Sequence, residues 1–373
     1  MSWFQKLFGR KPAEPIQPEV TQNADGSVST SYSFTLDGGS MRPVADEVVE
    51  ALDDALGRYG DVVHAVDPTR MLDFDAGGPP VWSVGTVVVD HEGQKYRLFL
   101  TYGFSSVLSP SDFRADYSHE YSIAVPVDDE ADVPAWPAAL LRHMTRYVLT
   151  TRADLRVGDN IPLPGPITRV AFSPEHHASM PDSVLDNLLV GPDPLLGSID
   201  TPRGSVEVRR LVGLRAEELR FVQQWNGEAF FRCMQAVRPD MTCELDRGSL
   251  LEEPDFSGPA SAGRDADGSS LGVLYCEGGW TTTPEGGHRV HLPGGADAAQ
   301  IRAVLEARLP FGRSLLLRGP PELGPVEFRP AEAFGIGLDG QRLVFEGQLD
   351  DPQLQAVLAA VDPSGTGGTI NIG

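Results

Sequence analysis

Three glycines, Gly335, Gly337 and Gly340, have the G-x-G-x-x-G spacing of a dinucleotide-binding loop. Such a loop must follow a strand and open a helix, because amides at the start of the helix face the pyrophosphate. Asp339 and Gly340 instead lead straight into the strand-like run QRLVFEG, a pattern typical of a hairpin turn. The chain also lacks a G-x-x-x-x-G-K-[ST] loop and a G-x-S-x-G elbow. The spacing therefore predicts a β-hairpin in place of a nucleotide site.

Histidine and cysteine residues offer the next candidates for chemistry. His176 and His177 are adjacent, and neighbours in an extended loop point apart, so they lack the H-E-x-x-H spacing of a zinc site. His119 and Glu120 are consecutive in a strand-like run and should face opposite sides. Cys233 is spaced among the apolar residues of a helix, which favours a buried, inert thiol. The sequence thus predicts no catalytic residue, no metal site and no cofactor, and the protein is expected not to be an enzyme.

Composition limits the classes of partner. The 373-residue chain has 30 basic and 53 acidic residues, for a formal net charge of −23. Binding to nucleic acid depends on neutralising phosphates with Lys and Arg, so we expect no nucleic-acid partner. An acidic surface attracts a basic protein through long-range steering, although excess acid can equally serve solubility. Three widely spaced cysteines and the lack of a secretory signal pattern predict a reduced, cytoplasmic protein, and the Arg-, Ala- and Gly-rich composition points to a bacterial gene.

The first twelve residues, MSWFQKLFGRKP, combine aromatic and basic side chains. Such a pattern can rest on a membrane surface or dock a partner. Two turns are marginal as an isolated helix, so we expect a frayed terminus over residues 1–12 in preference to membrane contact.

Periodicity predicts the elements that would position these residues. Apolar spacing of three to four residues predicts a helix over residues 43–58 and another beginning after Trp136, with Pro137 at its first position. Strand-like runs on either side of residues 91–93 predict a hairpin. Further strands are expected in EYSIAVPV, RGSVEVRRLVGL, LGVLYCEGG and RSLLLRG, and further helices around residues 298–308 and 354–360.

Local composition predicts the domain boundaries. Residues 252–270 are rich in Pro, Gly, Ser and Asp, which is typical of a linker. We therefore expect a flexible N-terminal segment over residues 1–40, an N-terminal domain over 41–251, a linker over 252–270, a C-terminal domain over 271–362 and a flexible tail over 363–373.

Several long motifs resemble one known family. The segment TPRGSVEVRRLVGLRAEELRFVQQWNG (201–227) closely resembles the signature of the suppressor of fused family. The segment PAWPAALLRHMTRYVLTTRADLRVGDNIPL (134–163) resembles that family's Trp-Pro-x-x-Leu helix and Gly-Asp turn. NLLVGPDPLLGSIDTPRG (187–204) falls between them in the family's order. The likeness runs over roughly residues 80–350 and is strongest over 134–250.

The resemblance implies an α+β fold of two domains, each a mixed or antiparallel sheet packed with helices, joined by a hinge and without enzymatic activity. For animal members it implies that a short peptide of Gli-type transcription factors enters between the domains as an added strand. For bacterial members it implies immunity proteins that neutralise toxins. Backbone pairing then gives affinity and side-chain pockets give specificity. We expect a basic toxin as partner; the alternatives are a scaffold that sequesters a transcription factor and an enzyme with an unrecognised site.

The family's signature includes Trp136 and Pro137 of the first helix and a polar break in the second segment. The resemblance implies that this break is the turn of a helical hairpin, where Gly227 relieves the backbone and polar side chains cap and bridge. Trp225 is expected to be a core anchor. The remaining residues of the break are Gln223, Gln224 and Asn226.

Two positions of the strong segment correspond to residues that contact the peptide in animal members. Tyr147 matches the tyrosine of the family's RYV motif, and Asp159 matches the aspartate of its Gly-Asp turn. Core packing is the alternative role for Tyr147, and a turn cap beside Gly158 is the alternative for Asp159. Asp297 and Ile301 fall where the C-terminal domain would complete the clamp, through a looser likeness.

Overall fold

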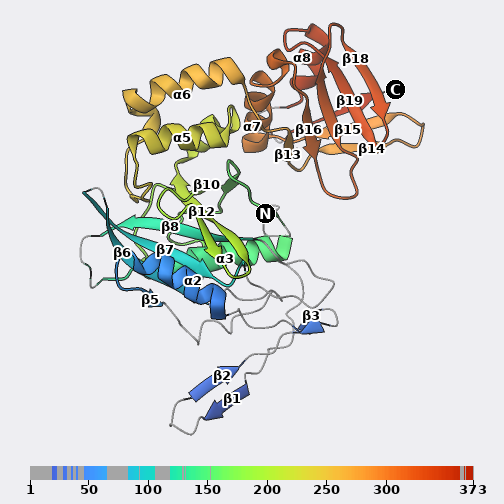
Figure 1. The fold of residues 1–373 in the computed structure, drawn as a ribbon. Helices are drawn as coiled ribbons and strands as arrows, with labels where there is room; N and C mark the ends of the chain where they lie inside the picture. The colour runs from blue at the N-terminus through green and yellow to red at the C-terminus, as the bar shows by residue number, and fades with distance from the viewer. Residues whose placement is uncertain are drawn as a thin grey trace. The chain divides into compact units, whose positions relative to one another are not determined.

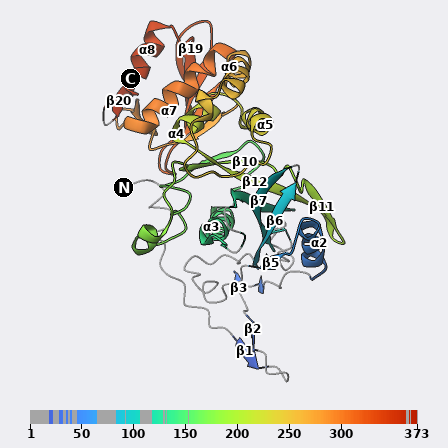
Figure 2. The ribbon, with the colours of Figure 1, turned by 90° about the vertical axis from the view of Figure 1, so that its left-hand side faces the viewer.

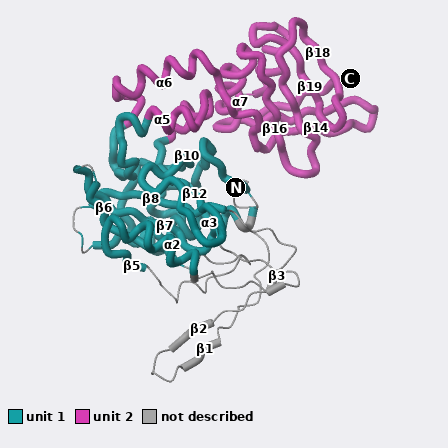
Figure 3. Tube along the Cα trace, in the orientation of Figure 1, with its two compact units in different colours: residues 1–215, 234–248 teal, residues 216–233, 249–373 magenta. Residues whose placement is uncertain are grey.

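The structure is a computed structural model that describes residues 46–64, 83–91, 93–105 and 118–372, except 128–129, 131, 152, 362–364 and 366, together with four short strands nearer the N-terminus. These strands form two antiparallel pairs, β1 (Glu19–Gln22) with β2 (Val28–Ser31) and β3 (Thr35–Leu36) with β4 (Gly39–Ser40). The aromatic and basic segment 1–12 lies outside the described residues. The chain divides into two compact units, residues 1–215 with 234–248 and residues 216–233 with 249–373 (Figure 3).

The first unit is built on an eight-stranded sheet with the order β5-β6-β7-β8-β12-β10-β9, in which β11 also pairs with β12 (Figure 1). Its neighbouring strands are antiparallel except β12 and β8, which are parallel. The predicted hairpin across residues 91–93 is confirmed, because His91 pairs with Gln94. The strands are β5 (Val63–His64), β6 (Ser83–His91), β7 (Gln94–Tyr102), β8 (His119–Pro126), β9 (Asn160–Pro162), β10 (Asn187–Pro192), β11 (Ser198–Thr201) and β12 (Gly204–Leu214).

Among the described residues, one helix covers each face of this sheet. α2 (Asp46–Gly57) and α3 (Ala135–Thr151) lie on opposite faces (Figure 2). Alternate residues of β7 serve the two helices: Leu98 and Leu100 share a buried cluster with α2, whereas Phe99 shares one with α3. A sheet that is buried on both faces explains why its strands read as nearly continuous apolar runs. Trp136 and Pro137 are buried at the start of α3.

The adjacent histidines lie in a short 3-10 helix, η1 (Pro174–Ser179). His176 is exposed and His177 is half-buried.

The second unit begins with the helices around the polar break. α4 (Ala216–Gln223) and α5 (Gly227–Val237) meet at this break, and Asn226 caps α5 because its Oδ1 accepts a hydrogen bond from the amide of Ala229 at 2.9 Å. Gln223 is buried and Gln224 is half-buried. The break therefore forms the turn between two helices.

Trp225 joins this turn to the following helix, α6 (Pro254–Asp267). Its side chain is 3% exposed, and its Nε1 donates to Asp267 Oδ2 at 3.1 Å. A Cβ on Gly263 would lie 2.2 Å from the indole ring, so only glycine lets α6 approach this closely. Trp225 thus packs between the helices of the second unit.

Two sheets complete the second unit. The larger has the order β13-β16-β17-β19-β18, and the smaller has the order β14-β15-β20. α7 (Gly295–Glu306) and α8 (Pro352–Leu358) contribute buried residues to the same core as these strands. The strands are β13 (Val273–Tyr275), β14 (Gly279–Thr282), β15 (His288–Leu292), β16 (Leu315–Arg318), β17 (Val326–Pro330), β18 (Gly335–Asp339), β19 (Arg342–Gly347) and β20 (Gly368–Ile372).

The glycine motif forms the predicted hairpin. Gly335 and Gly337 lie in β18, which pairs antiparallel with β19. Gly340 has φ of 62°, the left-handed conformation that a tight hairpin turn requires. No helix follows the motif, so its amides do not form a pyrophosphate site.

Two segments differ from the expectations drawn from composition. Residues 252–270, predicted to be a linker, contain α6 together with part of η2 (Leu250–Glu252). Phe256 and Ala260, four residues apart on one face of α6, are fully buried and hold this helix in place despite its Gly, Pro and Ser content. Within the predicted flexible tail, β20 pairs with β15, and its polar residues Thr369 and Asn371 alternate with Ile370 and Ile372.

The fold is α+β throughout. Among the helices that the structure describes, none combines the length and the apolar character that a membrane crossing requires.

Candidate functional site

Tyr147 lies on α3 at the border of its buried stripe. The stripe itself consists of Leu140, Met144 and Val148, each at most 1% exposed. Tyr147 is half-buried and packs against the same core cluster, and its carbonyl oxygen accepts a hydrogen bond from Thr151 Oγ1 at 2.7 Å. Core packing therefore accounts for part of the tyrosine ring, while the rest remains at the surface.

Asp159 sits in a tight turn that is tied to the sheet. Gly158 adopts φ of 93°, and Asp159 Oδ2 accepts a hydrogen bond from the amide of Arg156 at 2.8 Å. The amide of Gly158 donates to Val190 O at 2.8 Å, and the amide of Val190 donates to Asp159 O at 2.9 Å. The carboxylate thus caps its own turn, as the alternative role predicted, and it is also exposed at a rigid position.

Ion pairs fix the loop that carries Asp159. Arg209 donates to Glu207 at 2.8 and 2.9 Å and lies 3.7 Å from Asp154, which also accepts a hydrogen bond from Arg156 at 2.8 Å. The hydrogen bond from Arg156 lowers the pKa of Asp154 below its ordinary value. Partial desolvation raises the pKa of Asp159, although the amide of Arg156 works against this change. Three carboxylates face two guanidinium groups, so this surface is locally acidic.

Tyr147 and the Asp159 loop flank one core of the first unit. Leu155 and Ile161, on either side of the turn, belong to the same buried cluster against which Tyr147 packs. Ile161 lies in β9, the three-residue edge strand of the sheet, which pairs only with β10 among the described strands. The structure therefore brings Tyr147 and Asp159 to the edge of one sheet and its covering helix.

Asp297 and Ile301 belong to the second unit, where both lie on α7. Asp297 is half-buried in the first turn, and burial together with the nearby Glu277 raises the pKa of its carboxyl group. Ile301 is 1% exposed and packs in the core with Ala298 and Leu305. The predicted contact of Ile301 with a partner is therefore corrected to a core position, because its spacing of three residues from Ala298 and four from Leu305 places it on the buried stripe of α7.

Glu120 is a buried carboxylate that the sequence did not reveal as a special site. It is 0% exposed and accepts hydrogen bonds from Thr101 Oγ1, from the amides of Gly103 and Ser105 at 3.0 and 2.9 Å, and from Ser105 Oγ at 2.6 Å. Burial raises its pKa to about 7 despite these donors. His119 is also fully buried, because both faces of this sheet are covered. The carboxylate of Glu120 ties Thr101, Gly103 and Ser105 to β8.

The environment of each of the three cysteine thiols disfavours the thiolate form. Burial raises the pKa of Cys233 and Cys243, and it raises the pKa of Cys276 to about 11. The thiolate is the reactive form, so a raised pKa lowers reactivity at neutral pH. Within the part of the chain that the structure describes, no group of three or more His, Cys, Asp and Glu side chains is placed to hold a metal ion.

Comparison with known proteins relates part of the chain to one family. The sequence model of the suppressor of fused protein family matches residues 81–248, the segment that contains Tyr147, Asp159 and the polar break. The chain carries a suppressor of fused domain. The human suppressor of fused homolog is 26% identical over 228 residues, which cover 56% of this chain and 43% of the human protein. The suppressor of fused likeness thus spans less than half the length of that relative.

Solved structures of suppressor of fused proteins extend the comparison. The crystal structure of Drosophila Suppressor of Fused matches with a TM-score of 0.63 and 15% identity, covering 89% of this chain and 98% of that chain. This likeness establishes a shared fold. A chain of the crystallised Sufu–Fu complex matches 58% of this chain and 97% of its own length, at 21% identity and a TM-score of 0.46. That score is too low to establish a common fold.

Proposed function

We propose that this protein acts by binding another protein and catalyses no reaction of its own. The suppressor of fused domain over residues 81–248 carries the proposal, because the family resemblance implies recognition of a peptide segment. In the first unit, Asp159 offers an exposed carboxylate on a rigid turn, and the neighbouring β9 is an edge strand. An edge strand can pair with an extended peptide, while side chains beside it select the sequence.

The partner is a basic protein in this proposal. The chain has a net charge of −23, and the surface around Asp159 contains more carboxylates than guanidinium groups. Complementary charge speeds association and disfavours acidic partners. Tyr147 supplies a half-buried aromatic ring, which packs against the same core cluster as the residues on either side of the Asp159 turn. Asp297 would add contacts from the second unit.

The finer proposal is that binding inhibits the partner, as an immunity protein in the cytoplasm inhibits a toxin. The acidic surface supports this role because it suits a basic toxin domain. A partner with catalytic residues would be a toxin, whereas a partner with nucleic-acid-binding motifs would make the protein a scaffold or regulator.

A pull-down from native lysate tests the proposal. The tagged wild-type protein is compared with Tyr147→Ala/Asp159→Arg and with the matched control Tyr59→Ala/Asp61→Arg. Tyr59 is half-buried against the other core cluster of the first unit, and Asp61 is exposed just before β5, at the opposite edge of the sheet from β9. Circular dichroism checks that all three proteins are folded.

We expect one protein to be retained by the wild type and by the control and to be lost by Tyr147→Ala/Asp159→Arg. Co-expression of that protein should then be toxic, and this chain should relieve the toxicity. If both variants retain the partner equally, the binding surface does not include Tyr147 and Asp159. If the wild type retains no protein, the proposed function is wrong.

A further inference from the structure

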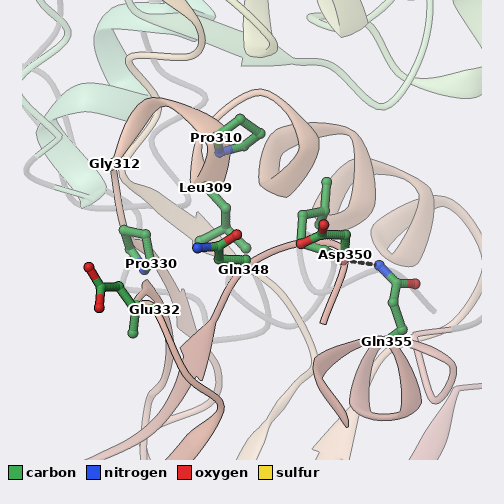
Figure 4. Close-up of a pocket in the computed structure, with 10 residues that line it drawn as sticks. Leu309, Pro310, Gly312, Pro330, Glu332, Gln348, Asp350 and Gln355 are labelled. Atoms are coloured by element: carbon green, nitrogen blue, oxygen red, sulfur yellow. Dashed lines mark hydrogen bonds between the residues drawn. The ribbon is translucent and has the colours of Figure 1, made fainter. Parts of the chain in front are cut away.

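A groove in the second unit lies where two parallel strands end. β17 and β19 are parallel neighbours, and Pro330 pairs with Gly347, so the chain leaves both strands at the same edge of the sheet. One exit leads to β18 and the other to α8, while η3 (Leu309–Phe311) lies beside β17. A groove of about 980 Å³ opens among these three segments (Figure 4). Loops at the carboxyl ends of parallel strands are a common place for ligands.

The walls of the groove are largely apolar. Leu309, which is 5% exposed, belongs to the unit's core, whereas Pro310 is exposed and Pro330 and Leu349 are half-buried. A groove of this volume is much larger than one small ion and can hold several side chains.

The acids of the groove lack a countercharge. Glu332 and Asp350 are exposed and lie on either side of Gln348 (Figure 4). Within the described residues, no hydrogen bond or ion pair involves either carboxylate. Two negative charges therefore face the solvent beside an apolar surface.

The arginines nearest to the groove residues in the sequence have other partners: Arg313 donates to Ser269 O at 3.0 Å, and Arg342 donates to Glu327 at 3.2 Å. Arg308 is 7% exposed and donates to Ser269 O at 2.8 Å and to Ser314 O at 2.7 Å. Arg329 donates to Glu327 at 3.3 Å and to Asp339 at 3.0 Å. These four arginines therefore do not neutralise Glu332 and Asp350, which leaves both carboxylates open to a cationic ligand.

We propose that this groove binds an extended basic segment of the protein partner. The aliphatic stem of a Lys or Arg side chain packs along Leu309, Pro310 and Pro330, and its cationic head meets the carboxylates of Glu332 and Asp350. An amphipathic side chain of this kind satisfies both the apolar walls and the acidic rim. A bare cation would leave the apolar walls unused, and an acidic ligand would be repelled by the chain's net charge of −23.

This site deepens the proposed function and rests on it, because the occupant is a segment of a protein. It is separate from the Tyr147 and Asp159 surface, which belongs to the other unit. The groove would add a second recognition element for basic residues in the same partner.

Fluorescence polarisation with a defined peptide tests the groove. The probe is the labelled peptide Gly-Leu-Lys-Leu-Arg-Leu-Lys-Gly, and its counterpart carries Glu at each basic position. The full-length wild type is compared with Glu332→Gln/Asp350→Asn and with the control Glu285→Gln/Glu322→Gln. The control removes the same charge from two exposed acids of the same unit that do not line the groove.

We expect the wild type and the control to bind the basic peptide and not the acidic one, and the groove variant to bind at least about tenfold more weakly. Equal weakening in both variants would assign the attraction to diffuse charge, and no binding by the wild type would overturn the site. If the peptide does not bind and the groove variant converts a dimer to a monomer in light scattering, the occupant is a second copy and the proposal is wrong. Any of these failures leaves partner capture through Tyr147 and Asp159 untouched, whereas failure of the wild-type pull-down refutes the proposed function itself.

Discussion

A buried ion pair in the first unit contrasts with two exposed acids beside the groove of the second unit. In the first unit, Arg210 and Asp193 are buried at 0% and 2% exposure, and the guanidinium group donates to Asp193 Oδ2 at 2.9 and 3.1 Å. It also donates to Asp240 O at 3.0 Å, while Asp193 Oδ1 accepts from the amides of Leu195 and Leu196 at 2.9 and 2.7 Å. Burial works to raise the pKa of Asp193, but Arg210 and these donors lower it on balance.

The second unit leaves Glu332 and Asp350 exposed beside an apolar groove, without a charged partner in the described part of the chain. A fully satisfied buried pair fixes the geometry of the segments that supply it. Exposed, uncompensated carboxylates contribute little to the fold and remain available to a ligand. The comparison separates a buried pair whose partners are all within the fold from two exposed acids that have no charged partner among the described residues.

Breaking the buried Arg210–Asp193 pair should cause the largest loss of stability. Arg210→Met leaves Asp193 buried without its countercharge, and we expect the first unit to lose about 3–5 kcal/mol in its free energy of unfolding. Hydrogen exchange followed by mass spectrometry should show faster exchange in peptides of the first unit and little change in the second. The double variant Arg210→Met/Asp193→Leu should recover much of the loss, and a single variant as stable as the wild type would refute the role of this pair.

The buried Glu120 should make the stability of the first unit depend on pH. Its pKa in the folded protein is about 7, against an ordinary value of 4.5, so the folded state holds a proton that the unfolded chain releases. The free energy of unfolding of the first unit should therefore fall as pH rises from about 4.5 to 7, by up to about 3 kcal/mol.

Glu120→Gln removes this titration. Urea unfolding at pH 4.5, 6 and 7.5 should show the stability of the variant rising relative to the wild type as pH increases, whatever its constant offset. A difference that stays constant with pH would show that Glu120 does not titrate in this range.

Gly263→Ala tests packing that belongs to the second unit alone. The new methyl group would lie 2.2 Å from the Trp225 ring, and we expect a loss of about 1–3 kcal/mol through overpacking. Gly258, in the same helix, has no atom within 4 Å of a Cβ, so Gly258→Ala should be neutral or slightly stabilising through helix propensity. Chemical unfolding monitored by tryptophan fluorescence distinguishes the two variants, and equal behaviour would contradict the close approach of α6 to Trp225.

The smallest expected effect concerns the helix beside the groove. Asp351 caps α8, because its Oδ1 accepts hydrogen bonds from the amides of Gln353 and Leu354 at 2.8 and 3.3 Å. Asp351→Ala should cost about 1 kcal/mol, and Asp351→Asn should cost less because an amide oxygen still caps the helix. Thermal unfolding of both variants would check this order.

Much of the fold was predictable because local patterns carry it. The spacing of apolar residues located α2 and α3, and the Asp339-Gly340 turn identified the β18–β19 hairpin. The long motifs of residues 134–250 indicated the family, and the family model matches residues 81–248.

The remaining features depend on contacts that a single sequence does not display. The segment of α6 looked like a linker because its Gly and Pro residues obscure the apolar spacing of Phe256 and Ala260. The close packing of Trp225 against Gly263 is a contact between distant parts of the sequence, so composition does not reveal it. Strand alternation could not show that Glu120 would be enclosed by four donors. Ile301 was expected to bind through a loose family likeness, which did not indicate which face of α7 is buried.

Site-specific photocrosslinking in living cells tests the central claim most directly. Tyr147 is replaced by p-benzoylphenylalanine, which keeps an aromatic ring, and Val63 is replaced in a parallel control because it is 54% exposed on β5, at the opposite edge of the sheet from β9. The account predicts that irradiation joins one specific, basic protein to position 147 and not to position 63. The absence of a protein adduct at position 147, or the same adducts at both positions, would contradict the claim that this surface of the suppressor of fused domain binds a protein partner.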